Sequence, residues 1–530
     1  MPKTQAVPPV GYHYLTSRGK TCRVRRAEVN AAAVLRPRKD AHARPVNVTP
    51  DVIDPKSKVS WPTQAVAIGA SLLIAGCASM APTYDSPPLP VASSYATDDL
   101  QEGTRAAAIG WRDYFTDPRL QALIVQALDH NRDLRVAAFR VEEARATYGI
   151  QRADLFPNVD AQAGMNRSRT PADLSATGQP FIGSQYQVGV GTTSWEIDFW
   201  GRVRSLRDAA LESFLASDAS RRAAAIGLVA QVAGSDLVLC ELNERIVIAN
   251  QTVASHQESV RIFTRRVEVG SLSRLELTQV QTLLMQAQAV ATQLEQARAA
   301  EFDTLTLLAG TPVAMPPLQQ KLDERDAMAE LLPGLPSELL TQRPDIVAAE
   351  HQLRAAHASI GAARAAFFPR VSLTGSLGTA STELDGLFAS GSRTWSFSPN
   401  ISLPIFDGGR LRNNLSLADA RRDIAVATYE KTVQSAFRDV ADALAARRWL
   451  AAQLAIAERA RATQAERARL SRLRYDNGGA AFFEVLDAQR DLLSAEQQLV
   501  QTRRALLASR ISLYAALGGG AMDHVPGPTP

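Results

Sequence analysis

Two carboxylates one helical turn apart are the residues whose type and spacing point most directly to chemistry. Glu484 and Asp487 lie three residues apart in an apolar-periodic segment after Gly478, so they share one face of a predicted helix. Two like charges on one face repel each other and attract cations. The alternative is structural, because acids also favour the first turn of a helix, where the helix dipole stabilises them. The pattern indicates electrostatic rather than covalent chemistry.

One thiol stands in a context typical of lipid modification. Cys77 follows an uncharged, largely apolar stretch at residues 65–76, with Lys56 and Lys58 before it. This stretch has the length of a signal-peptide core and is too short for a membrane-spanning helix. The small residues around the cysteine resemble a bacterial lipobox, so a covalent diacylglycerol and N-acyl lipid on Cys77 is the only prosthetic group we expect. The alternative is an ordinary signal peptide with an incidental cysteine.

The residues before this signal peptide are unusual, because signal peptides carry only a short basic lead. We expect residues 1–76 to contain an N-terminal extension followed by a lipoprotein signal peptide. The extension would result from a misassigned start, with translation beginning at a later codon such as that of Val52. Residues 1–58 hold 12 Lys or Arg and 4 Asp or Glu, whereas the rest of the chain holds 46 and 50. The basic charge therefore belongs to the leader, and the body lacks the positive surface that nucleic acid requires.

Signatures of enzymes are absent from the sequence. The seven His residues have no metal-ligand spacing, and there is no Walker loop or nucleophile elbow. We therefore predict no catalytic residue, no metal and no enzymatic activity. Three cysteines cannot form a disulfide framework, and Cys240, in an apolar helical stretch, is expected to be a buried hydrophobe.

The chain repeats itself 208–212 residues later, and this duplication decides which elements position the acids. The Arg-Ala…Phe-Pro segment at residues 152–159 returns at 364–371, and the Gly-Arg segment at 200–203 returns at 408–411. The same alignment matches Gly270 with Gly478. The acids and their neighbour Arg490 are largely confined to the second copy, as their first-copy counterparts show: Glu276, Gln279 and Thr282 stand opposite Glu484, Asp487 and Arg490.

Each copy must be built from long helices. Two long windows, residues 181–311 and 405–525, contain no proline, and residues 410–475 are rich in Ala, Arg, Leu and Glu. A helix of about 65 residues spans roughly 100 Å. After Gly478 apolar residues recur every seven positions, which predicts coiled-coil packing. A further helix is predicted from Leu120 to Leu155, ended by a Phe-Pro pair.

Each copy also contains two predicted strands. They lie at residues 158–167 and 185–199 in the first copy, and at 371–378 and 395–403 in the second. In the second copy apolar residues alternate cleanly with small polar ones, which suits the wall of a membrane barrel. Two hairpins packed on a soluble core are the alternative, but the lipobox and the long helices favour the membrane.

This order of lipobox, helix, Phe-Pro, strands, Gly-Arg and long helices resembles the TolC-like outer membrane factors. Within them it is most similar to the NodT-type lipoproteins of resistance-nodulation-division efflux pumps. The resemblance covers about residues 111–518. It implies a mixed α and β membrane protein in which three protomers give four strands each to a twelve-stranded outer membrane β-barrel, continued by a periplasmic α-helical coiled-coil barrel. Oligomerisation agrees with the physics of bilayers, since open sheet edges are not tolerated in lipid.

The resemblance implies partners, location and function together. We expect a homotrimer that contacts outer membrane lipids, a periplasmic adaptor (membrane fusion) protein and an inner membrane resistance-nodulation-division pump, and no nucleic acid. It would be lipid-anchored in the outer membrane of a Gram-negative bacterium, extend into the periplasm, and serve as a passive exit duct for drugs or other small toxic compounds. One alternative is an exit duct for type I protein secretion. The other is a coiled-coil lipoprotein scaffold without a pore, and the alternating strands argue against this scaffold.

The resemblance also implies a gate at the periplasmic tip. Asp487 and Arg490 match the aperture acid and partner base of the lipoprotein subset, and Phe483 matches its bulky apolar plug. In a trimer Glu484 would add a second ring of carboxylates. Tyr475 matches the family's tyrosine before the turn glycine.

Some family features are less clear in this chain. Ala480 stands where some members use an arginine latch, so a latch there is in doubt. The turn residues are expected to meet the adaptor, although they could equally be ordinary helix-turn-helix corners; they are Gly270, Ser271, Leu272, Gly478 and Gly479.

The predicted segments follow from these features. They are the extension and signal peptide (1–76), a lipid-anchored extended tether (77–110), the first outer membrane efflux repeat (111–310), a connector (311–341), the second repeat (342–518) and a disordered C-terminal tail (519–530).

Overall fold

The computed structural model describes residues 80–88, 90–92, 104–105, 109–318, 322, 328, 331–332 and 343–520. All of these belong to one compact unit, residues 67–530. The signal peptide, Cys77 and much of the tether therefore lie outside the described residues. So do most of the connector and residues 521–530 of the predicted tail.

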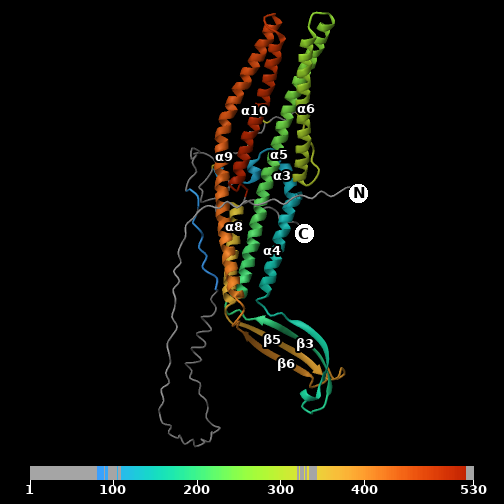
Figure 1. Cartoon of the computed structure of the whole chain (residues 1–530), viewed down its shortest axis with the longest axis vertical. Coiled ribbons are helices and arrows are strands. Elements are labelled where there is room, and N and C mark those ends of the chain that lie inside the picture. The colour runs from blue at the N-terminus through green and yellow to red at the C-terminus, as the bar shows by residue number, and fades with distance from the viewer. Residues whose placement is uncertain are drawn as a thin grey trace, which may run out of the picture. The chain divides into compact units, whose positions relative to one another are not determined.

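Four helices form two long hairpins that run side by side (Figure 1). In the first hairpin, α5 (Arg202–Glu268) is followed by α6 (Arg274–Ala309). In the second, α9 (Arg410–Asp476) is followed by α10 (Phe482–Ala516). Both α5 and α9 have 67 residues, so each is about 100 Å long. The long helix predicted over residues 410–475 is confirmed.

The helix predicted from Leu120 to Leu155 is wrong as a single element. It is divided into α3 (Pro118–His130) and α4 (Arg132–Ala153). Asn131 between them is extended, with φ −61° and ψ 132°, and its side chain caps α4 by accepting from the backbone N–H of Leu134. The same side chain donates to the carbonyl of Leu308, at the end of α6, over 2.9 Å. Capping and this remote contact together break the helix.

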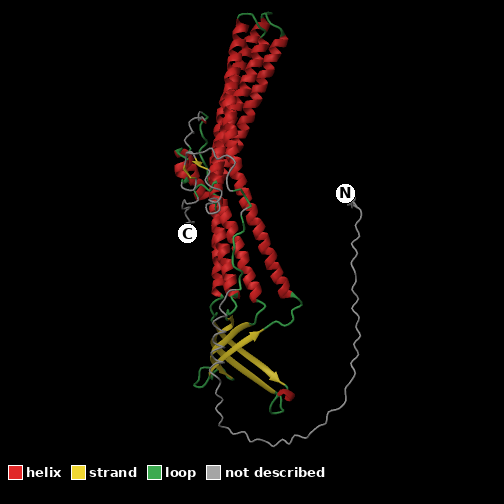
Figure 2. Ribbon diagram, turned by 90° about the vertical axis from the view of Figure 1, so that its left-hand side faces the viewer, coloured by secondary structure: helices red, strands yellow, loops and turns green. Residues whose placement is uncertain are grey.

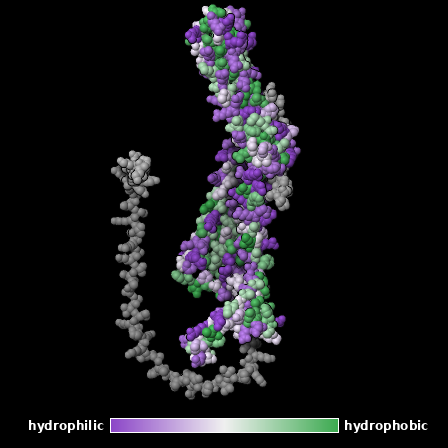
Figure 3. All heavy atoms as spheres, turned by 90° about the vertical axis from the view of Figure 1, so that its right-hand side faces the viewer, coloured by the Kyte–Doolittle hydropathy of each residue, from purple (hydrophilic) through white to green (hydrophobic). Residues whose placement is uncertain are grey.

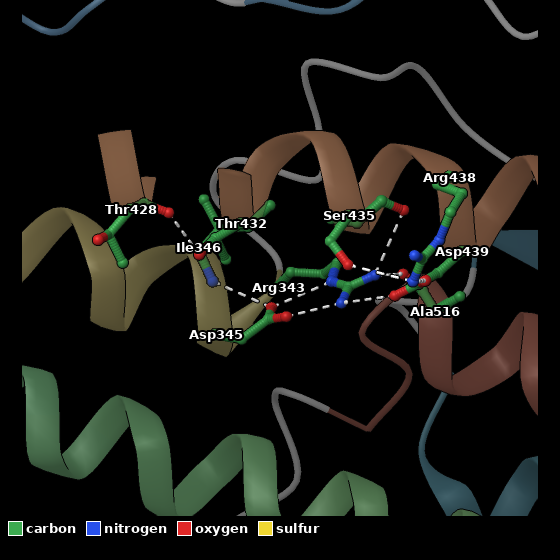
Figure 4. A network of polar contacts seen from close by, with 10 residues as sticks. Arg343, Asp345, Ile346, Thr428, Thr432, Ser435, Arg438, Asp439 and Ala516 are labelled. Carbon is green, nitrogen blue, oxygen red and sulfur yellow. Dashed lines mark hydrogen bonds and ion pairs between the residues drawn. The ribbon is translucent and has the colours of Figure 1, made fainter. Parts of the chain in front are cut away.

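The second half contains an equivalent contact. Arg343 stands 212 positions after Asn131 and directly precedes α8 (Pro344–Ala365). Its guanidinium donates to the carbonyl of Ala516 over 3.0 Å, and Ala516 stands 208 positions after the carbonyl that Asn131 contacts. Figure 4 shows this guanidinium also paired with Asp345 at 2.6 Å and with Asp439 at 3.4 Å. In both halves, the start of a short helix is thus fastened to the end of a hairpin.

Four of the strands form an antiparallel sheet in the order β2-β3-β5-β6, next to one end of the helices (Figure 2). Their bounds are β2 (Asp160–Thr170), β3 (Phe181–Glu196), β5 (Arg370–Ser381) and β6 (Arg393–Ser402), with a short 3-10 helix, η2 (Ala172–Leu174), after β2. Their extents agree with the predicted strands to within a few residues. The two hairpins β2–β3 and β5–β6 meet along β3 and β5.

The register gives the sheet two different faces. One row across all four strands is apolar: Ala161, Val190, Leu377 and Trp395. The adjacent row, on the opposite face, is polar or small: Asp160, Gly191, Ser376 and Ser396. The apolar side chains are open to the surroundings, since Leu377 is 61% and Trp395 76% exposed. Large exposed apolar residues continue where the sheet meets the helices, at Phe367, Phe368, Ile405 and Phe406, and Figure 3 shows hydrophobic side chains gathered in this region.

The main hydrophobic core lies midway along the helices. Here α2 (Trp111–Tyr114) packs against α10, and the Tyr114 ring stacks on Tyr514 at 4.3 Å. Leu322 and Leu331 of the connector are buried in the same core, beside a two-stranded parallel pair of β1 (Thr104–Arg105) and β4 (Leu331–Leu332).

One helix of the described residues, α5, is long and apolar enough by composition to cross a membrane. However, 56% of its apolar window is buried inside the structure. Cys240, on α5, is fully buried, as predicted. This helix therefore has the character of a core element.

Candidate functional site: the tip of the hairpins

Both helical turns lie at the end of the hairpins away from the sheet (Figure 1). Gly270 and Gly478 have φ of +73° and +71°, a left-handed conformation that glycine adopts without a steric penalty. The Ser271 hydroxyl donates to the carbonyl of Arg266, and the Gly479 N–H to that of Arg474. The turn residues predicted to contact a partner are therefore gathered at one end.

An apolar cluster joins the two hairpins just behind the turns. Its buried members come from both hairpins: Phe263, Val280, Phe482, Val485 and Leu486. The ring centroids of Phe263 and Phe482 are 4.3 Å apart, and the Tyr475 ring meets Phe482 edge-on at 4.8 Å. The Tyr475 hydroxyl also accepts from the guanidinium of Arg266 at 2.6 Å. Tyr475 thus ties the second hairpin to the first.

Four charged residues form a second cluster, the tip charge cluster: Arg467, Asp487, Arg490 and Asp491. Asp487 accepts from Arg490 at 2.5 Å, as the predicted pairing of acid and base requires. Arg467, on α9, donates to Asp487 at 2.8 Å and to Asp491 at 2.6 Å. Arg490 also contacts Asp491, at 2.9 Å. Each carboxylate therefore has two arginine partners.

The pairing stabilises the charged form of both types of group. Hydrogen bonds from Arg490 and then from Arg467 hold the pKa of Asp491 below its ordinary value. The carboxylate of Asp491 is likewise the main cause of the raised pKa of Arg467 and of Arg490. Asp491, Arg467 and Arg490 are therefore held in their charged forms.

Glu484 lies in the first turn of α10, where the structural alternative places it. Its first-copy counterpart Glu276 closes a capping box with Ser273. In the second copy Ala481 occupies the N-cap and makes no side-chain cap. The carboxylate of Glu484 instead pairs with Arg474 at 3.0 Å. The carboxylate is therefore not only stabilised by the helix dipole, because it also links α10 to α9.

Phe483 is 59% exposed and lines a shallow hollow of about 200 Å³ between α6 and α10. The hollow is lined by residues of both copies: Gln279, Thr282, Leu283, Phe483, Leu486, Asp487 and Arg490. The structure therefore brings three predicted gate residues, Phe483, Asp487 and Arg490, onto one surface. They lie opposite Gln279 and Thr282, the first-copy counterparts of Asp487 and Arg490.

Sequence reasoning missed Arg467 and Arg474. Both stand on α9 and reach across the hairpin to acids on α10. A signal was present, because the arms of an antiparallel hairpin place residues at similar distances from the turn next to each other. Arg467 stands 11 residues before Gly478, and Asp487 and Asp491 stand 9 and 13 after it.

In the part of the chain that the structure describes, no group of three or more His, Cys, Asp or Glu side chains is arranged to hold a metal ion. The predicted lipidation residue Cys77 lies outside the described residues.

Comparison with known proteins identifies the family. The model of outer membrane efflux proteins matches residues 123–311 and 335–519, which is most of the chain. The chain belongs to the outer membrane efflux protein family. This is a family of channels rather than of enzymes, and it places this outer membrane efflux protein in the outer membrane, as predicted.

Individual relatives agree over nearly their full lengths. The outer membrane protein OprJ of Pseudomonas aeruginosa is 44% identical over 460 residues, covering 86% of this chain and 96% of the relative. The solvent efflux pump outer membrane protein SrpC of Pseudomonas putida is 43% identical, covering 85% and 97%. The open state of the MtrE outer membrane channel of Neisseria gonorrhoeae has a TM-score of 0.76 at 37% identity, covering 84% of this chain and 99% of that chain. This outer membrane efflux protein is thus similar to efflux-pump components and to solved channels.

Proposed function

We propose that this outer membrane efflux protein is the trimeric exit duct of a tripartite efflux pump. One observation carries the proposal: a sheet with a continuous apolar face and outer strands β2 and β6, joined to two long helical hairpins. Within the described residues, β2 and β6 each pair along one side only. Three such sheets, joined β6 to β2, would close a twelve-stranded barrel without free edges.

The exposed apolar residues support insertion into a bilayer. The row from Ala161 to Trp395 would face lipid, and the polar row would face the lumen. Phe367, Phe368 and Phe406 are exposed where strands give way to helices. Aromatic side chains are favoured at this level of a membrane.

Lipid attachment at Cys77 is part of the proposal. Ala81, near the start of the described chain, lies against Gly361 on α8. A Cβ added at Gly361 would lie 2.8 Å from the Cα of Ala81. Gly361 stands four residues before α8 ends, beside the sheet. The described chain therefore begins at the sheet end of the helices, three residues after Cys77 in the sequence, which supports an anchor in the same membrane.

Substrate and partners are proposed from the relatives. SrpC is described as a component of a solvent efflux pump. We infer that this chain passes drugs or other small toxic compounds, passively, from an inner membrane resistance-nodulation-division pump. The adaptor protein would contact the turns at Gly270 and Gly478, which lie farthest from the proposed membrane segment.

The aperture would lie at the tip, with Phe483, Glu484, Asp487 and Arg490 around the pore and Tyr475 holding the hairpins together. The contacts of Asp487 with Arg490 and Arg467 support this assignment, as does the hollow that Phe483 lines. Opening requires the second hairpin to move, which breaks the Arg266–Tyr475 contact.

The test is single-channel conductance of the purified mature protein in planar bilayers. Glu484→Ala/Asp487→Ala should enlarge the resting conductance and weaken block by La³⁺, because two carboxylates and their links to α9 are removed. Gln288→Ala, at an exposed position of α6 outside this hollow, is the control and should leave both unchanged. Conductance and La³⁺ block that ignore the double substitution would reject the aperture assignment. Absence of channels from a folded trimer would reject the duct itself.

A further inference from the structure

We propose that Arg467 sets the charge of the aperture, and hence its affinity for cations, by pairing with Asp487 and Asp491. The inference rests on the proposed function and goes beyond it, because Arg467 lies on α9, whereas the acids lie on α10. It is a specificity-determining residue that acts through its neighbours.

The geometry is that of a guanidinium fork holding two acids. One terminal nitrogen donates to Asp491 over 2.6 Å and the other to Asp487 over 2.8 Å. The two acids stand four residues apart, so they project from the same face of α10. A planar arginine can bind both at once, whereas the ammonium of a lysine is a single point charge.

The arrangement exists only in the second hairpin. Its first-copy counterparts carry no charge: Ser259, Gln279, Thr282 and Leu283 stand 208 positions before Arg467, Asp487, Arg490 and Asp491. The first hairpin is otherwise built in the same way, with a long helix, a left-handed glycine and a helix of similar length. General packing of a hairpin tip therefore does not require the four charges.

Charge balance decides what Arg467 does. The tip charge cluster holds two arginines and two aspartates and is neutral. Arg490 alone can neutralise one of the two acids, so without Arg467 each protomer has one uncompensated negative charge, and a trimer has three. The side chains are 44% (Arg467), 26% (Asp487) and 30% (Asp491) exposed, which leaves the acids within reach of a cation.

Loss of Arg467 should not unfold the protein. Partly exposed ion pairs contribute little to stability, because solvent screens them. The apolar cluster around Phe482 remains in place and continues to hold the hairpins together. Changes in cation affinity can therefore be separated from loss of structure.

The experiment compares three variants in planar bilayers with La³⁺ as the probe. Arg467→Gln should lower the half-blocking La³⁺ concentration by about three- to tenfold and increase cation selectivity, because three carboxylates lose their counter-ion. Arg467→Lys should give a smaller shift, because it keeps the charge and loses the fork. Arg469→Gln is the matched control; Arg469 stands on the same helix and pairs with Glu466, three residues before it. It should shift block by less than twofold.

Two outcomes overturn the proposal. One is an equal shift in Arg467→Gln and Arg469→Gln, which would mean that only net charge matters. The other is an unchanged half-blocking concentration in a variant that still conducts. Titration calorimetry of La³⁺ into the detergent-purified protein keeps the proposal testable if no currents are recorded. Tighter binding by Arg467→Gln supports it, equal binding refutes it, and missing currents in the wild type count against the proposed duct alone.

Discussion

The burial of one ionisable side chain, His256, makes the stability of the fold depend on pH. It lies on α5, is 3% exposed, and the loss of water around it lowers its pKa below the ordinary value of 6.5. In the unfolded chain the imidazole binds a proton at higher pH than in the folded protein. Stability is therefore lost as pH falls below about 6.5, since the unfolded state then takes up more protons.

We predict a lower melting temperature at pH 5.5 than at pH 7.5, and a smaller difference in His256→Gln. Circular dichroism melts of the detergent-purified protein measure both. His130→Gln, at an exposed histidine, should retain the wild-type difference. An equal pH dependence in wild type and His256→Gln would contradict the role given to this burial.

At the scale of elements, the contact between α3–α4 and the end of α6 depends on a glycine. Gly310 has φ +70°, and a Cβ added there would lie 2.2 Å from the carbonyl oxygen of His130. Gly270 has nearly the same φ, with no atom within 4 Å of its added Cβ. The two positions separate backbone strain from steric clash.

We predict that Gly310→Ala costs clearly more stability than Gly270→Ala. The latter should cost about 1 kcal/mol, for the left-handed backbone alone. Gly310→Ala adds the clash with α3 and should cost at least about twice as much. Thermal melting of both variants measures the two losses of stability. Equal losses would show that the contact between α3 and the end of α6 shifts at no cost to make room for the added methyl group.

Elements that depend on local pattern could be predicted from the sequence, and contacts between distant segments could not. The absence of proline led to α9 with accurate bounds, and the seven-residue period led to a coiled-coil helix after Gly478, where α10 lies. The break at Asn131 was missed because its partner, Leu308, is 177 residues away. Arg467 was missed for a related reason: its acids belong to another helix, and only the antiparallel hairpin brings them together. The pairing of Asp487 with Arg490 was expected from the family resemblance, and it lies within one helix.

For the whole molecule, the two faces of the sheet decide whether it enters a membrane. Leu377 and Ser376 are neighbours on β5 whose side chains lie on opposite faces. A lysine facing lipid near the bilayer midplane costs about 2–4 kcal/mol per protomer, whereas one in a lumen costs little. A closed trimer would carry this cost three times.

We therefore predict that Leu377→Lys abolishes or strongly reduces outer membrane trimers, while Ser376→Lys preserves them. Membrane fractionation followed by gel migration with and without heating reads out both effects. Trimers at wild-type levels in Leu377→Lys would show that this face does not contact lipid.

The equal lengths of α5 and α9 fix the distance between the sheet and the tips of the two hairpins. Deleting one residue within either helix draws back everything beyond it by about 1.5 Å and rotates it by about 100°. The apolar cluster around Phe482 would then face the wrong neighbour, because its members come from both hairpins. We therefore expect insertions and deletions to be tolerated only when they are made to the same extent in both hairpins, so that the members of this cluster still meet.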